Sequence, residues 1–486
     1  MITLSTEQNT ALEAMMAFIF DKEHDIFILH GGAGSGKTSV IARLVHELKL
    51  LETSHKIMAP TGRAARILAD KLNAYSQNKE ERSVTSTIHS AIYEYSHTEE
   101  GKGAPVQFYE LKQGTPDEKV LIMDEASMIG DLSQAPSSVY FGSGKLLSDI
   151  LEYVEDGNKA QRCKIIFVGD YAQLMPINES LSPALSVDYL AEHFNKKAKE
   201  FTLTQTFRQQ QESGVLANAL AIRSSIEKQN FSGFKLTLGL NNIEAIAEDD
   251  IAEAAAEKIR QQQSCIMLAH TNNQVFYYNH CIRELLWDNP QQLQIGDRLV
   301  ALQNSGKHPI LNGDMLKIVE ILDDTQHVSV LVKKYGKVDL AFRKIKVCLE
   351  DASQESDSII EVKILESLLF GKEKNITLAE KMALEAYFKL RYPQKNHDAQ
   401  KLKQLYSQDP YVHALQVKFG YAITCHKAQG GEWQHVYIDF DYQHRLDSAE
   451  FYRWAYTAIT RSAHQLYAAN APLRIKKSQP QVEEEL

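Results

Sequence analysis

A phosphate-binding loop is the feature that most constrains this chain. Residues 31–38 read GGAGSGKT and satisfy the pattern G-x-x-x-x-G-K-[ST]. An apolar segment at 25–30 precedes the loop, and apolar residues at helical spacing follow it. Glycines let backbone amides curl around phosphate oxygens, and the start of a helix adds positive potential. We therefore expect this strand, loop and helix to bind a nucleotide through Gly32, Ala33, Gly34, Ser35 and Gly36, with Lys37 on the outer phosphates and Thr38 on Mg²⁺.

The composition is that of an ordinary globular protein. The 486 residues are 44% hydrophobic and 24% charged, and by length we expect roughly three or four domains. No run of eighteen apolar residues and no signal-like N-terminus occurs, which predicts a cytoplasmic protein without a membrane segment. The five cysteines are far apart, so a disulfide framework or a structural metal is not expected. A net charge of −10 argues against a protein that coats nucleic acid over its whole surface, but it allows a local basic channel.

Short apolar runs alternate with helical patterns twice along the chain, which predicts two α/β domains with parallel sheets. The expected strands are 25–30, 56–60, 120–123 and 164–168 in the first half, and 264–270, 297–303, 433–440 and 465–469 in the second. Helices are expected at 272–286 and 448–463. Two stretches interrupt the pattern: 91–118, with a β-like segment at 106–111, and 319–411, with strands at 328–332, 344–349 and 359–364 and helices at 378–390 and 399–406.

A second acidic motif follows the apolar run 120–123. Asp124 and Glu125 come directly after this expected strand, at the sheet edge where ligands bind. Asp124 is expected to hold Mg²⁺ through water, and Glu125 to orient or deprotonate the attacking water, as phosphoryl transfer requires. The alternative is a solvated pair of acids after a core strand, and the loop at 31–38 makes the catalytic interpretation the stronger one.

Seven further segments resemble, in order, the motifs of superfamily 1 helicases, and specifically those of the RecD-like and Dda-like 5′-to-3′ branch. They are LSTEQ at 4–8, APTGRAA at 59–65, TIH at 87–89, GDYAQLMP at 169–176, LTQTFR at 203–208, TCHKAQGGE at 424–432 and YTAITR at 456–461. The resemblance implies two RecA-like P-loop NTPase domains with two insertions, and an ATP-dependent DNA helicase that needs Mg²⁺. The implied domains are 1–90 with 119–205, an inserted pin at 91–118, 206–318 with 412–478, an inserted SH3-like domain at 319–411, and an acidic tail at 479–486.

On the nucleotide side, the resemblance implies roles for residues far from the phosphate loop. Gln8 would read adenine, and Phe207 could stack on it. Gln173 would sense the γ-phosphate, while Arg208 and Arg461 would reach it. Gly430 and Glu432 would also face the nucleotide. An arginine supplied from the second α/β domain acts only when the domains close on ATP, so hydrolysis would be tied to domain motion.

On the DNA side, the resemblance implies contacts with single-stranded DNA and, at the pin, with a forked duplex. The expected contact residues are Pro60, Thr61, Arg63, His89, Thr424 and His426. Phe108 or Tyr109 is our candidate for the tip of the pin, and the SH3-like domain would close the DNA channel. We expect a monomeric motor. No motif in 351–410 matches the family, which leaves the second insertion less clearly assigned.

Several of these residues have simpler structural interpretations. Thr61 can cap the helix that starts near Gly62, and His89 can be a core histidine. For Phe108, an ordinary strand residue is the favoured interpretation. Arg208 and Arg461 can be partners in structural ion pairs.

Three other functions remain open at this stage. The same motifs fit an RNA helicase, because only the 2′-hydroxyl separates the two backbones chemically. They also fit a DNA-binding ATPase subunit of a larger repair complex that does not unwind DNA productively. Asp357 with Glu361, Val362 and Lys363 has the D…ExK spacing of metal-dependent nucleases, but the alternating pattern indicates an exposed strand face, so a nuclease is not favoured.

Overall fold

The first half of the chain forms a six-stranded sheet. The computed structural model describes residues 3–74, 84–99, 106–114, 116–133, 139–155, 163–206, 213–350, 359–393, 398–441 and 445–475. The strand order of this sheet is β3-β2-β6-β8-β1-β9. The bounds are β1 Ile26–Gly31, β2 His55–Ala59, β3 Thr85–Thr87, β6 Val120–Met123, β8 Lys164–Gly169 and β9 Ala198–Leu203. Strands β2 and β6 pair in parallel, as do β6 and β8, and β1 and β9. The four strands expected from the first half are therefore confirmed.

The helices of this half follow the strands and cover the sheet. They are α1 Thr6–Ile19, α2 Lys37–Leu50, α3 Gly62–Asn73, α4 Ile88–Ile92, α5 Leu146–Glu155 and α6 Val187–Phe194. Every residue of β1, β6 and β8 is buried, which is the pattern of central strands covered on both faces. The sheet therefore has the α/β construction that the alternating pattern predicts.

The second half contains a five-stranded parallel sheet of order β11-β21-β20-β12-β19. The strands are β11 Ile243–Ala245, β12 Cys265–Ala269, β19 Ala422–Thr424, β20 Trp433–Asp439 and β21 Ser462–Ala469. The helices are α7 Gly214–Glu227, α8 Glu248–Arg260, α9 Asn272–Leu286, α13 Cys425–Ala428 and α14 Ala449–Ile459, and a short parallel pair joins β10 Leu236–Leu238 to β22 Leu473–Ile475. The helix expected at 272–286 is confirmed, and that expected at 448–463 is shorter, because β21 begins at Ser462.

An antiparallel sheet occupies the second interruption of the α/β pattern. Its order is β15-β16-β14-β13-β18, and β17 pairs with β16. The strands are β13 Arg298–Ala301, β14 Met315–Ile321, β15 Gln326–Val332, β16 Gly336–Leu349, β17 Ile360–Leu365 and β18 Val417–Phe419, with helices α10 Glu366–Phe370, α11 Leu378–Arg391 and α12 Ala399–Gln408. The strand expected at 297–303 was assigned to the second parallel sheet. That assignment is wrong, because β13 pairs on both sides with antiparallel neighbours.

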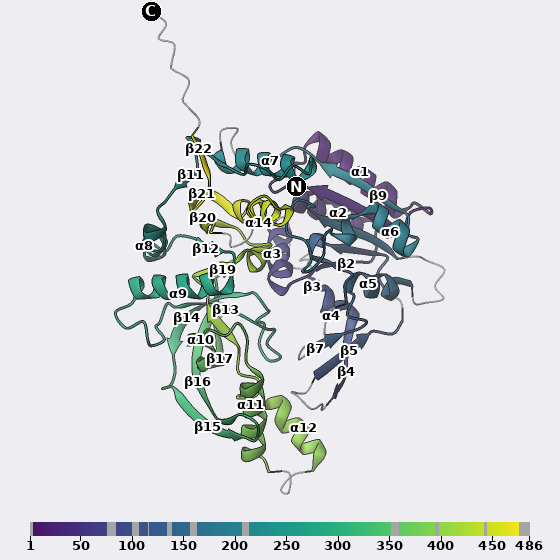
Figure 1. The fold of residues 1–486 in the computed structure, drawn as a ribbon. Helices are drawn as coiled ribbons and strands as arrows, with labels where there is room; N and C mark the ends of the chain where they lie inside the picture. Colours follow the sequence, from purple (N-terminus) through teal and green to yellow (C-terminus); the bar gives the residue numbers. More distant parts are fainter. Residues whose placement is uncertain are drawn as a thin grey trace, which may run out of the picture. The chain divides into compact units, whose positions relative to one another are not determined.

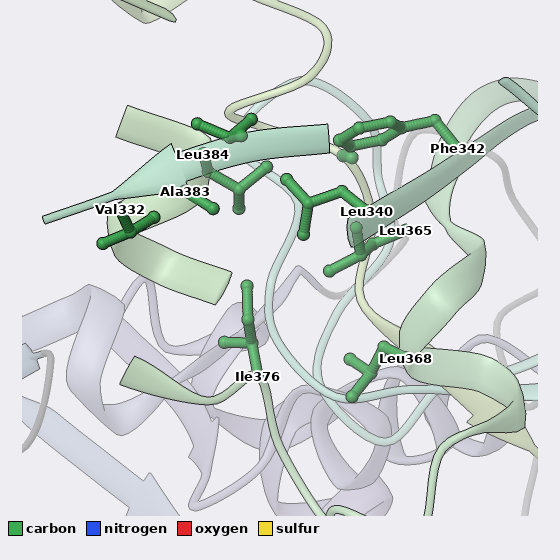
Figure 2. Packing of buried hydrophobic residues seen from close by; sticks show 10 residues of the cluster. Val332, Leu340, Phe342, Leu365, Leu368, Ile376, Ala383 and Leu384 are labelled. Atoms are coloured by element: carbon green, nitrogen blue, oxygen red, sulfur yellow. The ribbon is translucent and has the colours of Figure 1, made fainter. Parts of the chain in front are cut away.

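This antiparallel sheet has a core of its own. Phe342 and Leu340 from β16 and Val332 from β15 are buried against Ala383 and Leu384 of α11. Figure 2 shows these side chains converging between the strands and the helix. Burial of aliphatic and aromatic side chains of this size contributes about 1.5–3 kcal/mol each. Of this helix, Ala383 and Leu384 lie in the core, while Leu378 and Leu390 at its ends are exposed.

A smaller sheet occupies the first interruption. Its strands are β4 Tyr93–Glu99, β5 Val106–Leu111 and β7 Val139–Phe141; β4 and β5 are antiparallel, and β5 and β7 are parallel (Figure 1). The strand expected at 106–111 is confirmed. The contribution of β7 shows that this sheet draws on residues beyond 118, because the chain returns to it after β6.

The chain divides into two compact units. One contains Val45–Phe167 and Asn289–Gly420 together with Met1, and the other contains Ile2–Leu44, Val168–Asp288 and Tyr421–Leu486. The phosphate loop and the segments 169–176, 424–432 and 456–461 all lie in the second unit. Within the described residues, no helix has both the length and the apolar character needed to cross a bilayer.

Candidate nucleotide-binding site

The phosphate loop connects β1 to α2, as the sequence predicts. Gly34 and Gly36 have φ angles of +77° and +83°, values that glycine adopts readily and other residues rarely do. The amide of Ser35 donates to the carbonyl of Gly32 at 3.2 Å, which closes the turn. A Cβ atom added at Gly36 would lie 2.1 Å from Nε2 of Gln8. The glycine at position 36 is thus required both by its backbone conformation and by the packing of a neighbouring side chain.

Lys37 folds back over the loop. Its Nζ donates to the carbonyl oxygens of Gly31 at 2.7 Å and Gly32 at 3.1 Å. An ammonium group has three donors, so one remains for a phosphate oxygen. The position of Lys37 is that of the lysine which contacts the outer phosphates in loops of this pattern.

Gln8 supports the loop from α1. It forms a capping box with Ser5, in which the Gln8 amide accepts through Oε1 from the Ser5 backbone while its own backbone donates to Ser5 Oγ. Its Nε2 donates to the carbonyl of Ser35 at 3.1 Å. Gln8 is buried, and both ends of its amide are engaged in holding the loop. The role in reading adenine that the family resemblance implies stays a prediction.

Glu7, next to Gln8, holds the segment that follows β9. Its carboxylate accepts from the backbone and hydroxyl of Thr204 at 2.9 and 2.6 Å, and from the backbone of Gln205 at 2.9 Å. Burial opposes ionisation of Glu7, but these hydrogen bonds outweigh it and lower the pKa of Glu7 below its usual value. The start of the segment 203–208 is therefore fixed to α1.

Asp170 is the centre of a buried polar network beside the loop. It is fully buried, and Oδ1 accepts from Nη1 of Arg223 at 2.7 Å while Oδ2 accepts from the hydroxyl of Tyr456 at 2.7 Å. The same hydroxyl accepts from the backbone N–H of Ala33 at 3.3 Å. Burial alone would lower the pKa of Arg223, but Asp170 outweighs it and raises that pKa, so Arg223 stays charged. The network joins the phosphate loop to the segments 169–176 and 456–461.

One face of α14 holds the segment 169–176. Besides Tyr456, the hydroxyl of Thr457 accepts from the backbone of Leu174 at 2.9 Å, and the guanidinium of Arg453 donates to the carbonyls of Tyr171 and Gln173. Residues 453, 456 and 457 have the i, i+3, i+4 spacing that places side chains on one face of a helix. A displacement of α14 would therefore move the backbone around Gln173, whose side chain is buried.

A cavity of about 290 Å³ opens beside the phosphate loop. Gly32, Ala33, Arg223 and Tyr456 form its polar end. Its remaining wall is largely apolar and comes from the end of β9 and one face of α7, including Leu203, Val215, Leu216, Ala219 and Leu220. Polar groups beside the phosphate loop together with apolar side chains are compatible with the phosphates and base of a nucleotide.

Asp124 and Glu125 follow β6, as expected. The amide of Asp124 donates to the carbonyl of Met58 at 2.9 Å, and the amide of Glu125 donates to Oδ1 of Asp124 at 2.9 Å. Glu125 has a φ of +51°, in the left-handed region that non-glycine residues seldom occupy. Such strain costs on the order of 1 kcal/mol and is typical of functional positions. The conformation supports a specific role for Glu125 at the end of this strand.

Arg461 does not line the cavity in this structure. Its buried guanidinium donates to the carbonyls of Thr457 at 2.9 Å and Gly431 at 3.3 Å, and to the hydroxyl of Thr460 at 3.1 Å. It thus joins the end of α14 to the segment 424–432, in which Gly430 has a φ of +77°. Glu432 is half-buried. Phe207 and Arg208 lie outside the described residues.

The residues expected to touch DNA have structural partners of their own. Thr61 caps α3 by accepting from the backbone of Ala64 at 3.2 Å, as its simpler interpretation states. The ring of His89 packs edge-on against Phe141 at 4.8 Å, and burial lowers the pKa of His89. Both therefore serve the local fold, and their contacts with DNA stay predictions.

Four more of these residues differ in exposure. Pro60 and Thr424 are half-buried at strand ends, Arg63 is buried and His426 is exposed.

Phe108 lies within a strand and not at a turn. It pairs with His97 of β4 and its ring stacks on the His97 ring at 4.9 Å, while Tyr109 pairs with Tyr95. Both residues therefore lie inside β5, which spans Val106–Leu111, and the expectation that Phe108 or Tyr109 forms the tip of a pin stays a prediction. The favoured interpretation of Phe108 as a strand residue is confirmed.

The D…ExK pattern does not assemble into an independent site among the described residues. Glu361 lies on β17 and pairs with Lys344 of β16 at 2.5 Å, which lowers the pKa of Glu361. Lys363 stacks over the ring of Tyr411 at 4.5 Å. Asp357 lies outside the described residues. These contacts are those of an exposed strand face, as the sequence indicates.

Sequence reasoning assigned no role to Asp170, Arg223, Arg453 or Tyr456. Asp170 and Tyr456 lie inside recognised segments, so a systematic treatment of every polar residue there would have found them. Arg223 lies in α7, between recognised segments, and no motif in the sequence marks it. Only the fold brings it to the phosphate loop.

Two family matches cover the parts of the chain that build this site. Residues 15–179 match the family described as AAA domain, and residues 419–469 match the UvrD-like helicase C-terminal domain. The first match includes the phosphate loop and the acidic pair, and the second includes the segments 424–432 and 456–461.

Three relatives extend these matches. An uncharacterized protein of Acanthamoeba polyphaga mimivirus is 22% identical over 95% of this chain and 99% of its own length. The RecBCD enzyme subunit RecD of Buchnera aphidicola is 29% identical over 34% of this chain and 25% of its own length. The ATP-dependent RecD2 DNA helicase of Deinococcus radiodurans is 26% identical over 44% of this chain and 23% of its own length. The chain thus spans only about a quarter of either RecD relative.

Among solved structures, the chain is similar to that of Pif1 helicase from Bacteroides in complex with ADP-AlF3 and ssDNA. The identity is 14%, the TM-score is 0.47, and the alignment covers 98% of this chain and 95% of that one. The two α/β sheets of this chain agree with the fold class expected from sequence. The two family matches, the RecD relatives and the order of the motifs support a superfamily 1B helicase of the RecD type.

Proposed function

We propose that this chain is an ATP-dependent DNA helicase that moves 5′-to-3′ on single-stranded DNA and unwinds forked duplexes in replication, repair or recombination. One observation carries the proposal. The Tyr456 hydroxyl contacts both Ala33 of the phosphate loop and Asp170 of the segment 169–176. Occupation of the loop by ATP would compete for the Ala33 amide and so act directly on α14 and on the segments attached to it.

ATP is the substrate in this proposal, and Mg²⁺ is its cofactor. Lys37 binds the outer phosphates, and Thr38 and Asp124 supply the oxygen ligands that Mg²⁺ prefers. When bound, Mg²⁺ would neutralise charge on the phosphates as they separate. Glu125 orients or deprotonates the attacking water. Its strained backbone supports this role, because it holds the carboxylate in a defined position.

The remaining nucleotide residues sense the state of the γ-phosphate. In this proposal Gln173, Arg208 and Arg461 respond to it, Gly430 and Glu432 face the nucleotide, and Gln8 and Phe207 contact the base. Arg461 must exchange its bonds to the carbonyls of Thr457 and Gly431 for a phosphate contact. Such an exchange would pull on the segment 424–432, which also carries proposed DNA contacts.

The proposed DNA path uses residues at strand ends and helix starts. Backbone N–H groups at the start of a helix can bind DNA phosphates, and Thr61 lies at the start of α3. The sheet β4-β5-β7 is proposed as the pin that separates the DNA strands. The antiparallel sheet that contains β15, β16 and β17 is proposed as the SH3-like domain of 319–411 that closes the channel. The proposed contact residues are Pro60, Thr61, Arg63, His89, Phe108, Thr424 and His426.

The test is ATP hydrolysis by the full chain with and without single-stranded DNA. We expect DNA to stimulate turnover, and Lys37→Ala and Glu125→Gln each to abolish it. Glu253→Gln, a change at an exposed position of α8, is a matched control that should leave turnover unchanged. Unchanged hydrolysis in a folded Lys37→Ala or Glu125→Gln variant would contradict the proposal.

Two further substrates separate the alternatives in the same assay. Stimulation by RNA oligonucleotides in place of DNA would identify an RNA helicase. Stimulation by DNA without strand separation on a forked substrate would identify an ATPase subunit that needs partners to unwind.

A further inference from the structure

Arg223 of α7 lies at the polar end of the cavity, beside the phosphate loop. We propose that Arg223 is a nucleotide-contacting residue that binds the outer phosphates of ATP and makes the site prefer ATP over ADP, while Asp170 holds it in position. This inference rests on the proposed function, because it requires that ATP binds at the phosphate loop.

Gly32 provides the first argument. A Cβ atom added there would lie 3.0 Å from Nη1 of Arg223 and 3.3 Å from the hydroxyl of Tyr456. The phosphate-loop pattern leaves this second position open to any residue. Glycine at position 32 is thus explained by the close approach of the guanidinium to the loop backbone.

The phosphate that Arg223 would meet follows from Lys37. The Lys37 ammonium bonds to the carbonyls of Gly31 and Gly32, and in loops of this pattern that lysine reaches the outer phosphates. Arg223 approaches the loop at the same residue, Gly32. The two cations therefore converge on the end of the loop where ATP carries a phosphate that ADP lacks.

The donors of Arg223 are only partly used. Nη1 donates to Asp170 at 2.7 Å and to Tyr456 at 3.4 Å, and Nε donates to Glu227 at 3.1 Å. None of these three hydrogen bonds uses Nη2. A phosphate oxygen can therefore bind Nη2 while Asp170 remains paired with Nη1. Contact with ATP then does not leave the buried carboxylate without its cation.

The guanidinium is also held in place before a ligand arrives. It lies 4.6 Å from the ring centre of Tyr171, whose hydroxyl donates to the same Glu227 carboxylate at 2.5 Å. The side chain of Arg223 is only 11% exposed. A preorganised cation loses little side-chain entropy on binding, which favours a strong phosphate contact.

The experiment compares binding of a fluorescent ATP analogue and the matching ADP analogue to the full chain, with Mg²⁺ and without DNA. Arg223→Met should weaken ATP binding about 10- to 100-fold, the loss expected for one charge-assisted hydrogen bond, and weaken ADP binding by less than about threefold. Arg223→Lys should recover part of the ATP preference. Arg445→Met, which removes an exposed arginine paired with Asp447, is the matched control and should change neither affinity.

A double variant separates contact with ATP from a purely structural role. Arg223→Met leaves Asp170 buried without its cation, and Asp170→Asn added to it removes that charge. We expect the double variant to regain thermal stability but not the preference for ATP. Recovery of the preference would show that Arg223 acts only through Asp170, and an unchanged ATP-to-ADP ratio in Arg223→Met would likewise overturn the inference. Absence of ATP binding by the unsubstituted chain would overturn the proposed function and this inference together.

Discussion

The Tyr456 hydroxyl offers a quantitative test of the network around Asp170. Tyr456→Phe removes only the oxygen, so the ring continues to fill its buried position. The oxygen donates to the fully buried Asp170 carboxylate at 2.7 Å, and its other two hydrogen bonds, to Ala33 and Arg223, are long at 3.3 and 3.4 Å. A hydrogen bond to a charged group contributes about 1.5–3 kcal/mol. We therefore expect Tyr456→Phe to lower the free energy of unfolding by about 2 kcal/mol.

The assay is urea unfolding followed by tryptophan fluorescence. All three tryptophans, Trp287, Trp433 and Trp454, lie in the same unit as Tyr456, so the signal reports the unit that contains the network. Tyr277→Phe is the control, because Tyr277 lies in the same unit, is 59% exposed, and its substitution should change stability by less than about 0.5 kcal/mol. A loss for Tyr456→Phe no larger than that of the control would refute the reasoning, since it would mean that Asp170 does not depend on Tyr456.

Three further predictions concern the loop and its supports. Gly36→Ala should abolish nucleotide binding in a titration, because the added Cβ meets Gln8 and the φ of +83° is strained for alanine; retained affinity would contradict the packing described. Because the folded pKa of Glu7 lies below its ordinary 4.5, its stabilising effect should be complete above about pH 4.5 and disappear as the pH falls through the folded value. Glu7→Gln should therefore flatten the acid side of a stability–pH curve, and an unchanged curve would argue against the role of Glu7. Thr61→Ala should cost about 1 kcal/mol in unfolding experiments and Thr61→Ser much less, because serine retains the cap; equal losses would exclude capping as the cause.

The sequence predicts the parallel sheets well because strand, turn and helix there are local patterns. Strand β6 has the bounds expected, and α9 does as well. Strand β13 was misassigned for a physical reason. Its residues are apolar like those of a parallel strand, and only its partners, β14 and β18, reveal that it belongs to the antiparallel sheet.

The candidate site shows even more clearly that local sequence patterns do not reveal contacts between distant residues. Motif patterns identify Lys37 and Asp170 as members of recognised segments, because backbone geometry imposes fixed spacing within each segment. They carry no information about Arg223, which reaches Asp170 across 53 positions of the chain. Contacts of that kind depend on how α7 packs, and no local pattern in the sequence records it.

Arg461 illustrates a different limit. Its place in the segment 456–461 implies contact with the γ-phosphate, yet in this structure its donors are bound to Thr457, Thr460 and Gly431. A motif indicates which residue acts at some stage of the ATP hydrolysis cycle. A single conformation shows where that residue rests at one stage only.

Strand separation on tailed duplexes tests most directly whether the chain is a 5′-to-3′ DNA helicase. The full chain would be mixed with ATP, Mg²⁺ and a forked duplex bearing a single-stranded loading tail at either the 5′ or the 3′ end, with Lys37→Ala as the control. We expect ATP-dependent unwinding of the 5′-tailed substrate by the unsubstituted chain, and none by Lys37→Ala. Preferential unwinding of the 3′-tailed substrate would contradict the proposed polarity, and no unwinding of either substrate by a chain that hydrolyses ATP on DNA would contradict helicase activity itself.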